Sequence, residues 1–177
     1  MKDNKNLKEE LNKVKGCNCC HGEDNCNNHN EEHHSHEEHT PHVHGGKYIG
    51  EKKDGKAHGE GTYLYNDGSK YVGQWKEDMM HGEGIHTWIS GEKYIGLWEN
   101  DLKHGYGIYT WPDEESYIGE WKNDVKDGWG IYVWENGDKY IGQWKDDLRN
   151  GEGTLIYSDG EVYTGKWQND EPIESNN

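Results

Sequence analysis

Residues 71–93 read YVGQWKEDMMHGEGIHTWISGEK, and this stretch decides the fold. It opens with Tyr-x-Gly-x-Trp at 71–75, whose period of two is the period of a β-strand. A polar turn and Gly-x-Gly at 82–84 follow. A β-prone run then ends at Trp88, and Ser90-Gly91 supplies a second turn signal. The stretch therefore predicts one β-hairpin and the turn that leads to the next.

The same pattern recurs every 23 residues without insertion or deletion. Each copy opens with a tyrosine, and Gly-x-Gly begins 11 residues after the first five of these tyrosines. Such an unbroken period predicts a solenoid-like array, in which each unit is stabilised by its neighbours. The five full copies and the partial sixth begin at Tyr48, Tyr71, Tyr94, Tyr117, Tyr140 and Tyr163.

The glycines of each unit need a physical reason, because glycine weakens a strand. We expect a glycine opposite an aromatic residue to let the ring lie flat on the backbone. A ladder of tyrosine and tryptophan rings would then form the core of a single sheet. Each cross-strand aromatic pair is expected to contribute roughly 0.2–1 kcal/mol, so one hairpin alone would not fold and several stacked ones would.

The Y-x-G-x-W and H-G-x-G motifs at this period resemble the MORN (membrane occupation and recognition nexus) repeat over residues 48–170. The resemblance implies an all-β fold: an elongated, single-layer antiparallel sheet of stacked 23-residue hairpins with a concave aromatic groove. Lys52 replaces the first tryptophan, so the first unit is expected to be a cap. Asp78 and its equivalents stand where the family often has glycine; aspartate tolerates left-handed geometry, so the turn is expected to persist.

Composition excludes several classes of function. Hydrophobic residues make up 29% of the chain, and there are 9 Trp, 12 Tyr and no Phe, which suits a thin aromatic structure. The net charge of −16 argues against nucleic acid as a partner. Residues 48–177 hold 13 Lys/Arg and 26 Asp/Glu, which argues against binding of anionic membrane lipid by the repeats. The sequence also lacks a transmembrane run and a signal peptide, so a cytoplasmic location is expected.

Residues 1–47 are predicted to be a largely disordered tail, and residues 171–177 a disordered C-terminus. Leu7, Leu11 and Val14 are spaced as on one face of a helix, so a short helix is predicted at about residues 3–15.

Cysteine and histidine are concentrated in this tail. Three interpretations stay open: a low-complexity linker with incidental metal affinity, a site for Zn²⁺ or another transition metal, and a palmitoylation cluster at Cys17, Cys19 and Cys20. The array itself is expected to require no cofactor. The candidate metal ligands are Cys17, Cys19, Cys20, Cys26, His33, His34 and His36.

No catalytic set is expected. His58, His81 and His104 share one register, and neighbours would lie two strand widths apart, roughly 9–10 Å, too far for one metal ion. They are interpreted as turn residues. The predicted function is therefore a non-enzymatic scaffold or adaptor that binds a protein partner, and the resemblance implies a cytoskeletal, ciliary or membrane-junction setting. The alternatives are a membrane-tethering protein, by lipid binding or palmitoylation, and a metal-binding tail as the main activity.

Partner binding is predicted through the groove aromatics or through a sheet edge. The strand Tyr163–Trp167 is expected to offer an edge at which two copies can pair as a homodimer. The predicted groove aromatics are Tyr71, Trp75, Trp88, Tyr94, Trp98, Trp111, Tyr117, Trp121, Trp134, Tyr140, Trp144, Tyr163 and Trp167.

Overall fold

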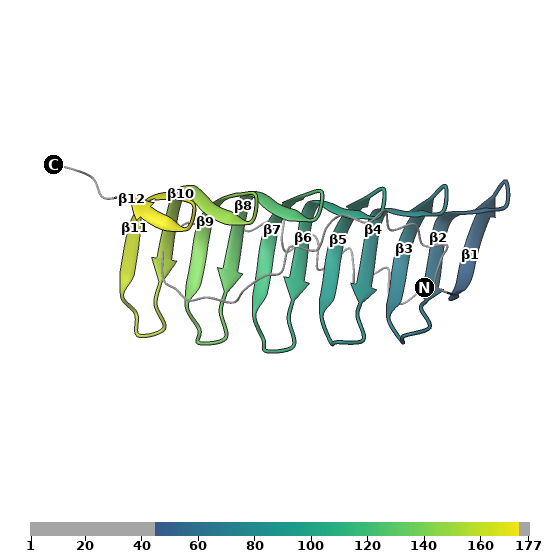
Figure 1. The fold of residues 1–177 in the computed structure, drawn as a ribbon, viewed down its shortest axis with the longest axis horizontal. Coiled ribbons are helices and arrows are strands. Elements are labelled where there is room, and N and C mark those ends of the chain that lie inside the picture. Colours follow the sequence, from purple (N-terminus) through teal and green to yellow (C-terminus); the bar gives the residue numbers. More distant parts are fainter. Residues whose placement is uncertain (1–44, 174–177) are drawn as a thin grey trace.

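The computed structural model describes residues 45–173, which form one antiparallel sheet of 12 strands in sequence order (Figure 1). This confirms the predicted fold class. The first strand of each repeat has seven residues: β1 Lys47–Lys53, β3 Lys70–Lys76, β5 Lys93–Glu99, β7 Ser116–Lys122, β9 Lys139–Lys145 and β11 Val162–Gln168. The second strand has nine residues in the five full repeats: β2 Lys56–Leu64, β4 Met79–Thr87, β6 Leu102–Thr110, β8 Val125–Val133 and β10 Leu148–Ile156.

The sheet extends beyond the predicted end of the array. β12, Glu171–Ile173, pairs with the end of β11, so these three residues belong to the sheet and not to a tail. The predicted helix at residues 3–15 and all the candidate metal and palmitoylation residues lie outside the described residues. Within residues 45–173 there is no helix that could cross a membrane.

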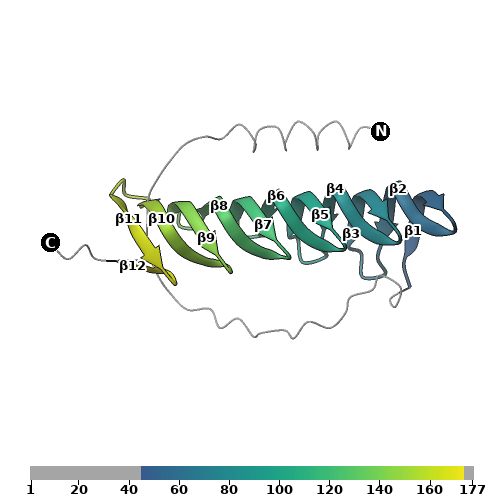
Figure 2. The same ribbon diagram turned by 90° about the horizontal axis from the view of Figure 1, so that it is seen from above.

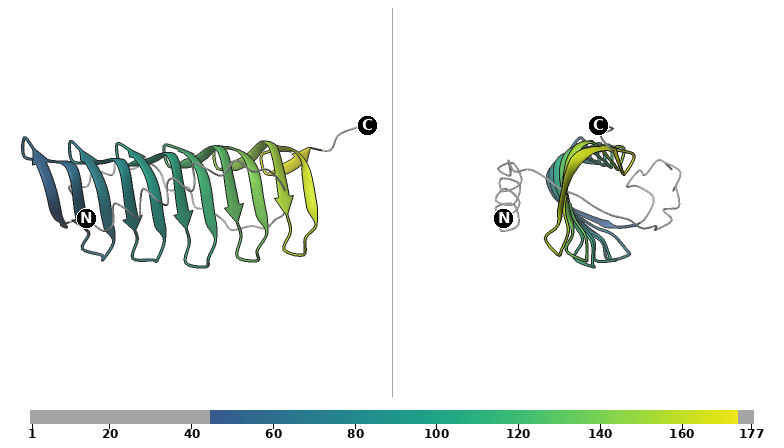
Figure 3. Two further views of the ribbon diagram at one scale, coloured as in Figure 1. Left: turned by 180° about the vertical axis from the view of Figure 1, so that it is seen from behind. Right: turned by 90° about the vertical axis from the view of Figure 1, so that its left-hand side faces the viewer.

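The sheet is curled across its strands into a half-pipe (Figures 2 and 3). Each hairpin within a repeat has a register shift, as between Gly73 and Trp75 in the β3–β4 pair, whereas the β4–β5 pair between repeats has continuous register. Gly82 lies opposite this shift with a φ of 62°. Since a bulge bends its strand and increases its twist, a bulge repeated in every hairpin accounts for the curl.

The rings of the repeat lie on the inner face of the curl. Side chains on the inside of a curved single layer converge and cover one another, whereas those on the outside diverge. Tyr71 is fully buried and Trp75 is 4% exposed, although the described residues form only one layer. Gln74, between them in sequence, points to the opposite face and is exposed.

The tyrosine rings are seated on paired glycines, as predicted. Gly73 pairs with Gly84 across the β3–β4 hairpin. A Cβ atom on Gly84 would lie 2.5 Å from Cζ of Tyr71 and closer still to its hydroxyl oxygen. The Tyr71 hydroxyl donates a hydrogen bond of 3.0 Å to the Gln74 carbonyl oxygen. The ring thus covers backbone that a larger residue would occupy.

The tight turn of each hairpin also joins neighbouring repeats. Glu77 and Asp78 have φ values of 52° and 72°, the left-handed pair of a type I′ turn, so the predicted turn persists. The Asp78 N–H donates to the Ala57 carbonyl oxygen at 3.1 Å, and the Ala57 N–H donates to Asp78 Oδ1 at 2.7 Å. The same two bonds recur at Asp101 with Met80, Asp124 with Lys103, Asp147 with Lys126 and Asp170 with Arg149. We call this arrangement the aspartate clamp.

The return turns at the other edge of the sheet make a second set of bonds between repeats. Asp67 Oδ1 accepts a hydrogen bond from the Ser69 N–H at 2.8 Å, and Ser69 Oγ accepts one from the Ile89 N–H of the next repeat at 3.1 Å. Asp138 Oδ1 accepts from the Ser158 N–H at 2.7 Å in the same way. Both edges of the array are therefore fastened repeat to repeat.

Replacing Asp124 with alanine is expected to lower the free energy of unfolding by about 2 kcal/mol, because the Lys103 N–H loses its acceptor and alanine must adopt a φ of 71°. Asp124→Asn keeps an acceptor and tolerates that φ, so it is expected to cost less than half as much. Urea denaturation followed by tryptophan fluorescence measures both. Equal losses for the two variants would mean that the clamp contributes nothing beyond the charge of Asp124.

Candidate functional site

The inner face is built from two sets of aromatic residues at different depths. The deeper set, which we call the ring core, contains the tyrosine that opens each repeat and the tryptophan four residues later. Tyr71 meets Trp75 edge-to-face at 5.1 Å and 88°, and it meets Trp98 of the next repeat at 5.6 Å and 90°. Burial raises the pKa of the Tyr71 hydroxyl, which therefore stays protonated and remains a hydrogen-bond donor.

Most of the predicted groove aromatics belong to this core and cannot form a contact surface. The tyrosines at 71, 94, 117 and 140 are fully buried, and the tryptophans at 75, 98, 121, 144 and 167 are between 1% and 6% exposed. The prediction that these nine residues contact a partner is wrong, because the curl of the sheet packs them against one another. Of the predicted set, Trp88, Trp111, Trp134 and Tyr163 keep accessible surface.

The shallower set, which we call the groove row, contains the aromatic residue 17 positions after each repeat tyrosine: Tyr65, Trp88, Trp111, Trp134 and Tyr157. These side chains are partly buried. Trp88 lies 4.1 Å from the His86 ring and 5.5 Å from Tyr109, and Trp111 lies 4.4 Å from Tyr109. The contacts continue through Tyr132 to Trp134. The groove row and the rings beside it thus form a continuous zigzag along the array.

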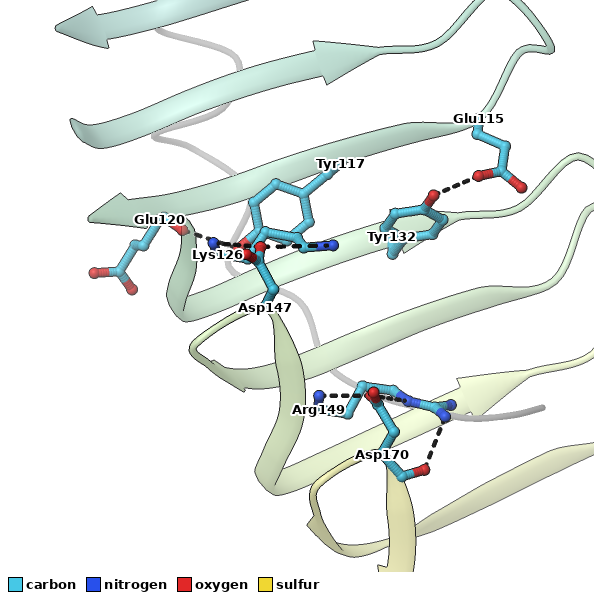
Figure 4. A network of polar contacts seen from close by, with 8 residues as sticks. All are labelled: Glu115, Tyr117, Glu120, Lys126, Tyr132, Asp147, Arg149 and Asp170. Atoms are coloured by element: carbon cyan, nitrogen blue, oxygen red, sulfur yellow. Dashed lines mark hydrogen bonds and ion pairs between the residues drawn. The ribbon is translucent and has the colours of Figure 1, made fainter. Parts of the chain in front are cut away.

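Three cations lie among these rings in the later repeats. Lys103 Nζ is 5.1 Å from the centre of the Tyr109 ring and 4.9 Å from that of Trp121, within the range of a cation–π interaction. It also lies 3.5 Å from Asp124 Oδ1 of the aspartate clamp. Lys126 and Arg149 occupy the equivalent positions and pair with Asp147 and Asp170 (Figure 4).

The floor of the groove therefore changes along its length. The first two repeats have Ala57 and Met80 at this register, both buried, and the next three have lysine or arginine. Sequence reasoning missed these cations. Their signal was the residue nine positions after each repeat tyrosine, where the side-chain type changes while the period is kept.

The repeated histidines are not turn residues as predicted. His58, His81 and His104 lie inside β2, β4 and β6, each just before the glycine of a bulge. His104 Nδ1 is 3.7 Å from Glu99 Oε2. Within residues 45–173, no three His, Cys, Asp or Glu side chains are placed to hold a metal ion. The described residues thus present a contact surface and no arrangement typical of a catalytic centre.

Comparison with known proteins agrees with this geometry. The sequence profile of the MORN repeat matches five consecutive segments, at residues 48–70, 71–93, 94–115, 117–139 and 140–162. A search of curated proteins gave no match. One similar solved structure is the SAS-4 (dCPAP) TCP domain of Drosophila melanogaster in complex with a proline-rich motif of Ana2 (dSTIL). It has 14% sequence identity and a TM-score of 0.42, and the similarity covers 61% of this chain and 60% of that one.

Proposed function

Because the chain belongs to the MORN repeat family, a family of generally non-enzymatic repeat proteins, we propose that it is a scaffold or adaptor that binds a protein partner through the groove row. The array supplies a fixed frame, and the groove row supplies the contact surface. The proposed settings are the cytoplasm and, within it, the cytoskeleton, a cilium or a membrane junction.

The accessible edge of the groove row is the observation that carries this proposal. Trp88, Trp111 and Trp134 are partly buried, and each rests on rings of its own repeat and the next. Aromatic side chains held in this way offer apolar area at little cost in conformational entropy, and such residues dominate protein interfaces. Neighbouring positions lie two strands apart, roughly 9–10 Å, so a segment lying along the groove would meet a ring at regular intervals.

Capture of a partner by the immobilised full-length chain tests the proposal. Trp111→Glu places a charge in the middle of the groove row and is expected to reduce the captured partner by about ten-fold or more, the effect of losing roughly 1.4 kcal/mol. Lys139→Glu on the exposed outer face is the matched control and is expected to keep the partner. Equal capture by the two variants, or the same partner on beads without the chain, would contradict binding in the groove.

The alternative functions have direct tests of their own. Salt-sensitive pelleting with anionic liposomes would support membrane tethering by lipid binding, against the acidic balance of the repeats. Palmitate on Cys17, Cys19 or Cys20 would support tethering through the tail. Stoichiometric binding of Zn²⁺ after EDTA treatment would support the metal-binding alternative. A homodimer through the edge of β11 stays a prediction, and the edge is partly covered: β12 pairs with only three residues of β11, Lys166, Trp167 and Gln168.

A further inference from the structure

The outer face of the sheet carries two exposed rings that the repeat does not require. They lie 12 residues after the tyrosine of the third and fourth repeats: Tyr106 in β6 is 39% exposed, and Trp129 in β8 is 43% exposed. The other full repeats have glutamate at this position: Glu60, Glu83 and Glu152. Since those repeats form the same hairpin with glutamate, the two rings are not needed for folding.

One carboxylate fixes the two rings as a pair. Glu120 of β7 lies between β6 and β8 and pairs with Tyr106 across the strands. It accepts hydrogen bonds from the Tyr106 hydroxyl and, at 2.8 Å, from the Trp129 backbone N–H. Its side chain points away from the ring of Tyr117 and from Lys126, which belong to the inner face (Figure 4). The rings therefore stand at fixed places on the surface opposite the groove.

An apolar stripe runs beside the pair. Ile95, Ile108, Ile118 and Ile131 face one another across successive strands on the outer face. A segment that crosses the strands over Tyr106 and Trp129 would have this stripe along one side. Exposed aromatic and apolar surface that is continuous over several strands is typical of an interaction site.

The distance between the rings identifies the conformation of a matching segment. Tyr106 and Trp129 lie at the same register two strands apart, about 9.4–9.8 Å. A polyproline II helix rises about 3.1 Å per residue with three residues per turn, about 9.3 Å per turn. One residue in every three of such a segment would therefore lie over a ring, and proline-rich segments dock on aromatic surfaces.

The charge of the row indicates what should flank the prolines. Glu83 lies one repeat before Tyr106 at the same register, and Glu152 lies one repeat after Trp129, 3.6 Å from Lys166. A segment continuing past Tyr106 would reach Glu83 after one more polyproline turn. We propose that the outer face binds a basic, proline-rich segment of the form Pro-x-x-Pro-x-x-Lys/Arg, with its prolines on Trp129 and Tyr106 and its basic residue at Glu83.

Titration of a labelled synthetic peptide with this spacing into the full-length chain, followed by fluorescence anisotropy, tests the proposal. The double variant Tyr106→Glu, Trp129→Glu gives the row the residue found in the other full repeats. It is expected to weaken binding about ten-fold or more while leaving the melting temperature unchanged. Glu83→Gln is expected to weaken binding a few-fold and to reduce its salt dependence, because one charge pair is lost.

Three outcomes would overturn this proposal. The first is no binding of the peptide at millimolar concentration. The second is equal affinity for a peptide of the same composition with the prolines two residues apart, since the period of three would then be irrelevant. The third is self-association of the chain that the double variant abolishes, because a second copy would then cover the patch. The groove variant Trp111→Glu should leave peptide affinity unchanged, so failure here is distinguishable from failure of the groove as a partner site.

Discussion

Replacing Gly107 with alanine is expected to lower the free energy of unfolding by about 3 kcal/mol, at the upper end of the usual cost of overpacking. The added Cβ would lie 2.5 Å from two ring carbons of Tyr94 and closer still to the hydroxyl oxygen. Tyr94 is fully buried and lies 5.0 Å from Trp98 and 5.6 Å from Trp121, so its ring cannot move without disturbing both repeats. The backbone of Gly107 accepts alanine, which makes the effect purely steric.

Urea denaturation followed by tryptophan fluorescence measures this loss, and Gly165→Ala is the matched control. Gly165 has the glycine's role in the partial sixth repeat, where the added Cβ would lie 3.0 Å from Tyr163. Tyr163 is 37% exposed and its ring has room to shift, so the expected loss is below about 1 kcal/mol. Similar losses for the two variants would show that the buried rings are not seated on glycine as described.

The parts of this fold that depend on one repeat could be predicted from sequence. Tyr71, Gly73 and Trp75 share a face because strands alternate, and the glycines opposite one another predict a ring lying on backbone. The period of 23 residues then predicts the order of the strands. These features depend on contacts within one hairpin or between adjacent ones, and the sequence displays them five times over.

The parts that depend on the curl could not be predicted. Alternation places the rings on one face, but it does not say how strongly the sheet bends, and the bend decides that Trp75 is buried while Trp88 keeps accessible surface. The bend itself follows from the left-handed bulge glycines such as Gly82. The aspartate clamp was missed for a related reason: Asp78 reads locally as a turn residue, whereas its carboxylate binds Ala57, 21 residues earlier.

The candidate site was predicted as a type of surface, and its residues were predicted only in part. An aromatic groove follows from the composition and the repeat, and Trp88, Trp111 and Trp134 were among the residues chosen. Lys103 and its equivalents were not, because a lysine in an acidic chain reads as solvated surface. The structure instead places it between two rings and beside Asp124.

Acidification is expected to destabilise the array through His86. This residue occupies the position of Tyr63, Tyr109 and Tyr132 in other repeats, is 6% exposed and lies 5.4 Å from Tyr65 and 4.1 Å from Trp88. Burial lowers the pKa of the imidazole to about 4, with a smaller lowering by Lys103 and an opposing effect of Asp67. The neutral ring is therefore the form that the fold accepts.

The direction of the pH effect follows from proton binding. In the unfolded chain the imidazole of His86 has a pKa near 6.5, so as pH falls from about 6.5 to 4 the unfolded state takes up a proton that the folded state refuses. Stability is fully present above about pH 6.5 and declines below it. At about 1.36 kcal/mol per pKa unit, the loss is about 1.4 kcal/mol at pH 5.5 and about 3 kcal/mol at pH 4.

His86→Tyr isolates this contribution, because it installs the residue of the neighbouring repeats and leaves the other histidines in place. Urea denaturation at pH 7.5 and 5.5 is expected to give a smaller fall in stability for the variant than for the parent chain, by about 1.4 kcal/mol. The other titrating groups are common to both chains and cancel in the comparison. An equal fall in the two chains would mean that a protonated His86 is accommodated in the folded array, since burial of the charged ring would then carry no penalty. A larger fall in the variant would reverse the sign and place the pH sensitivity in groups other than His86.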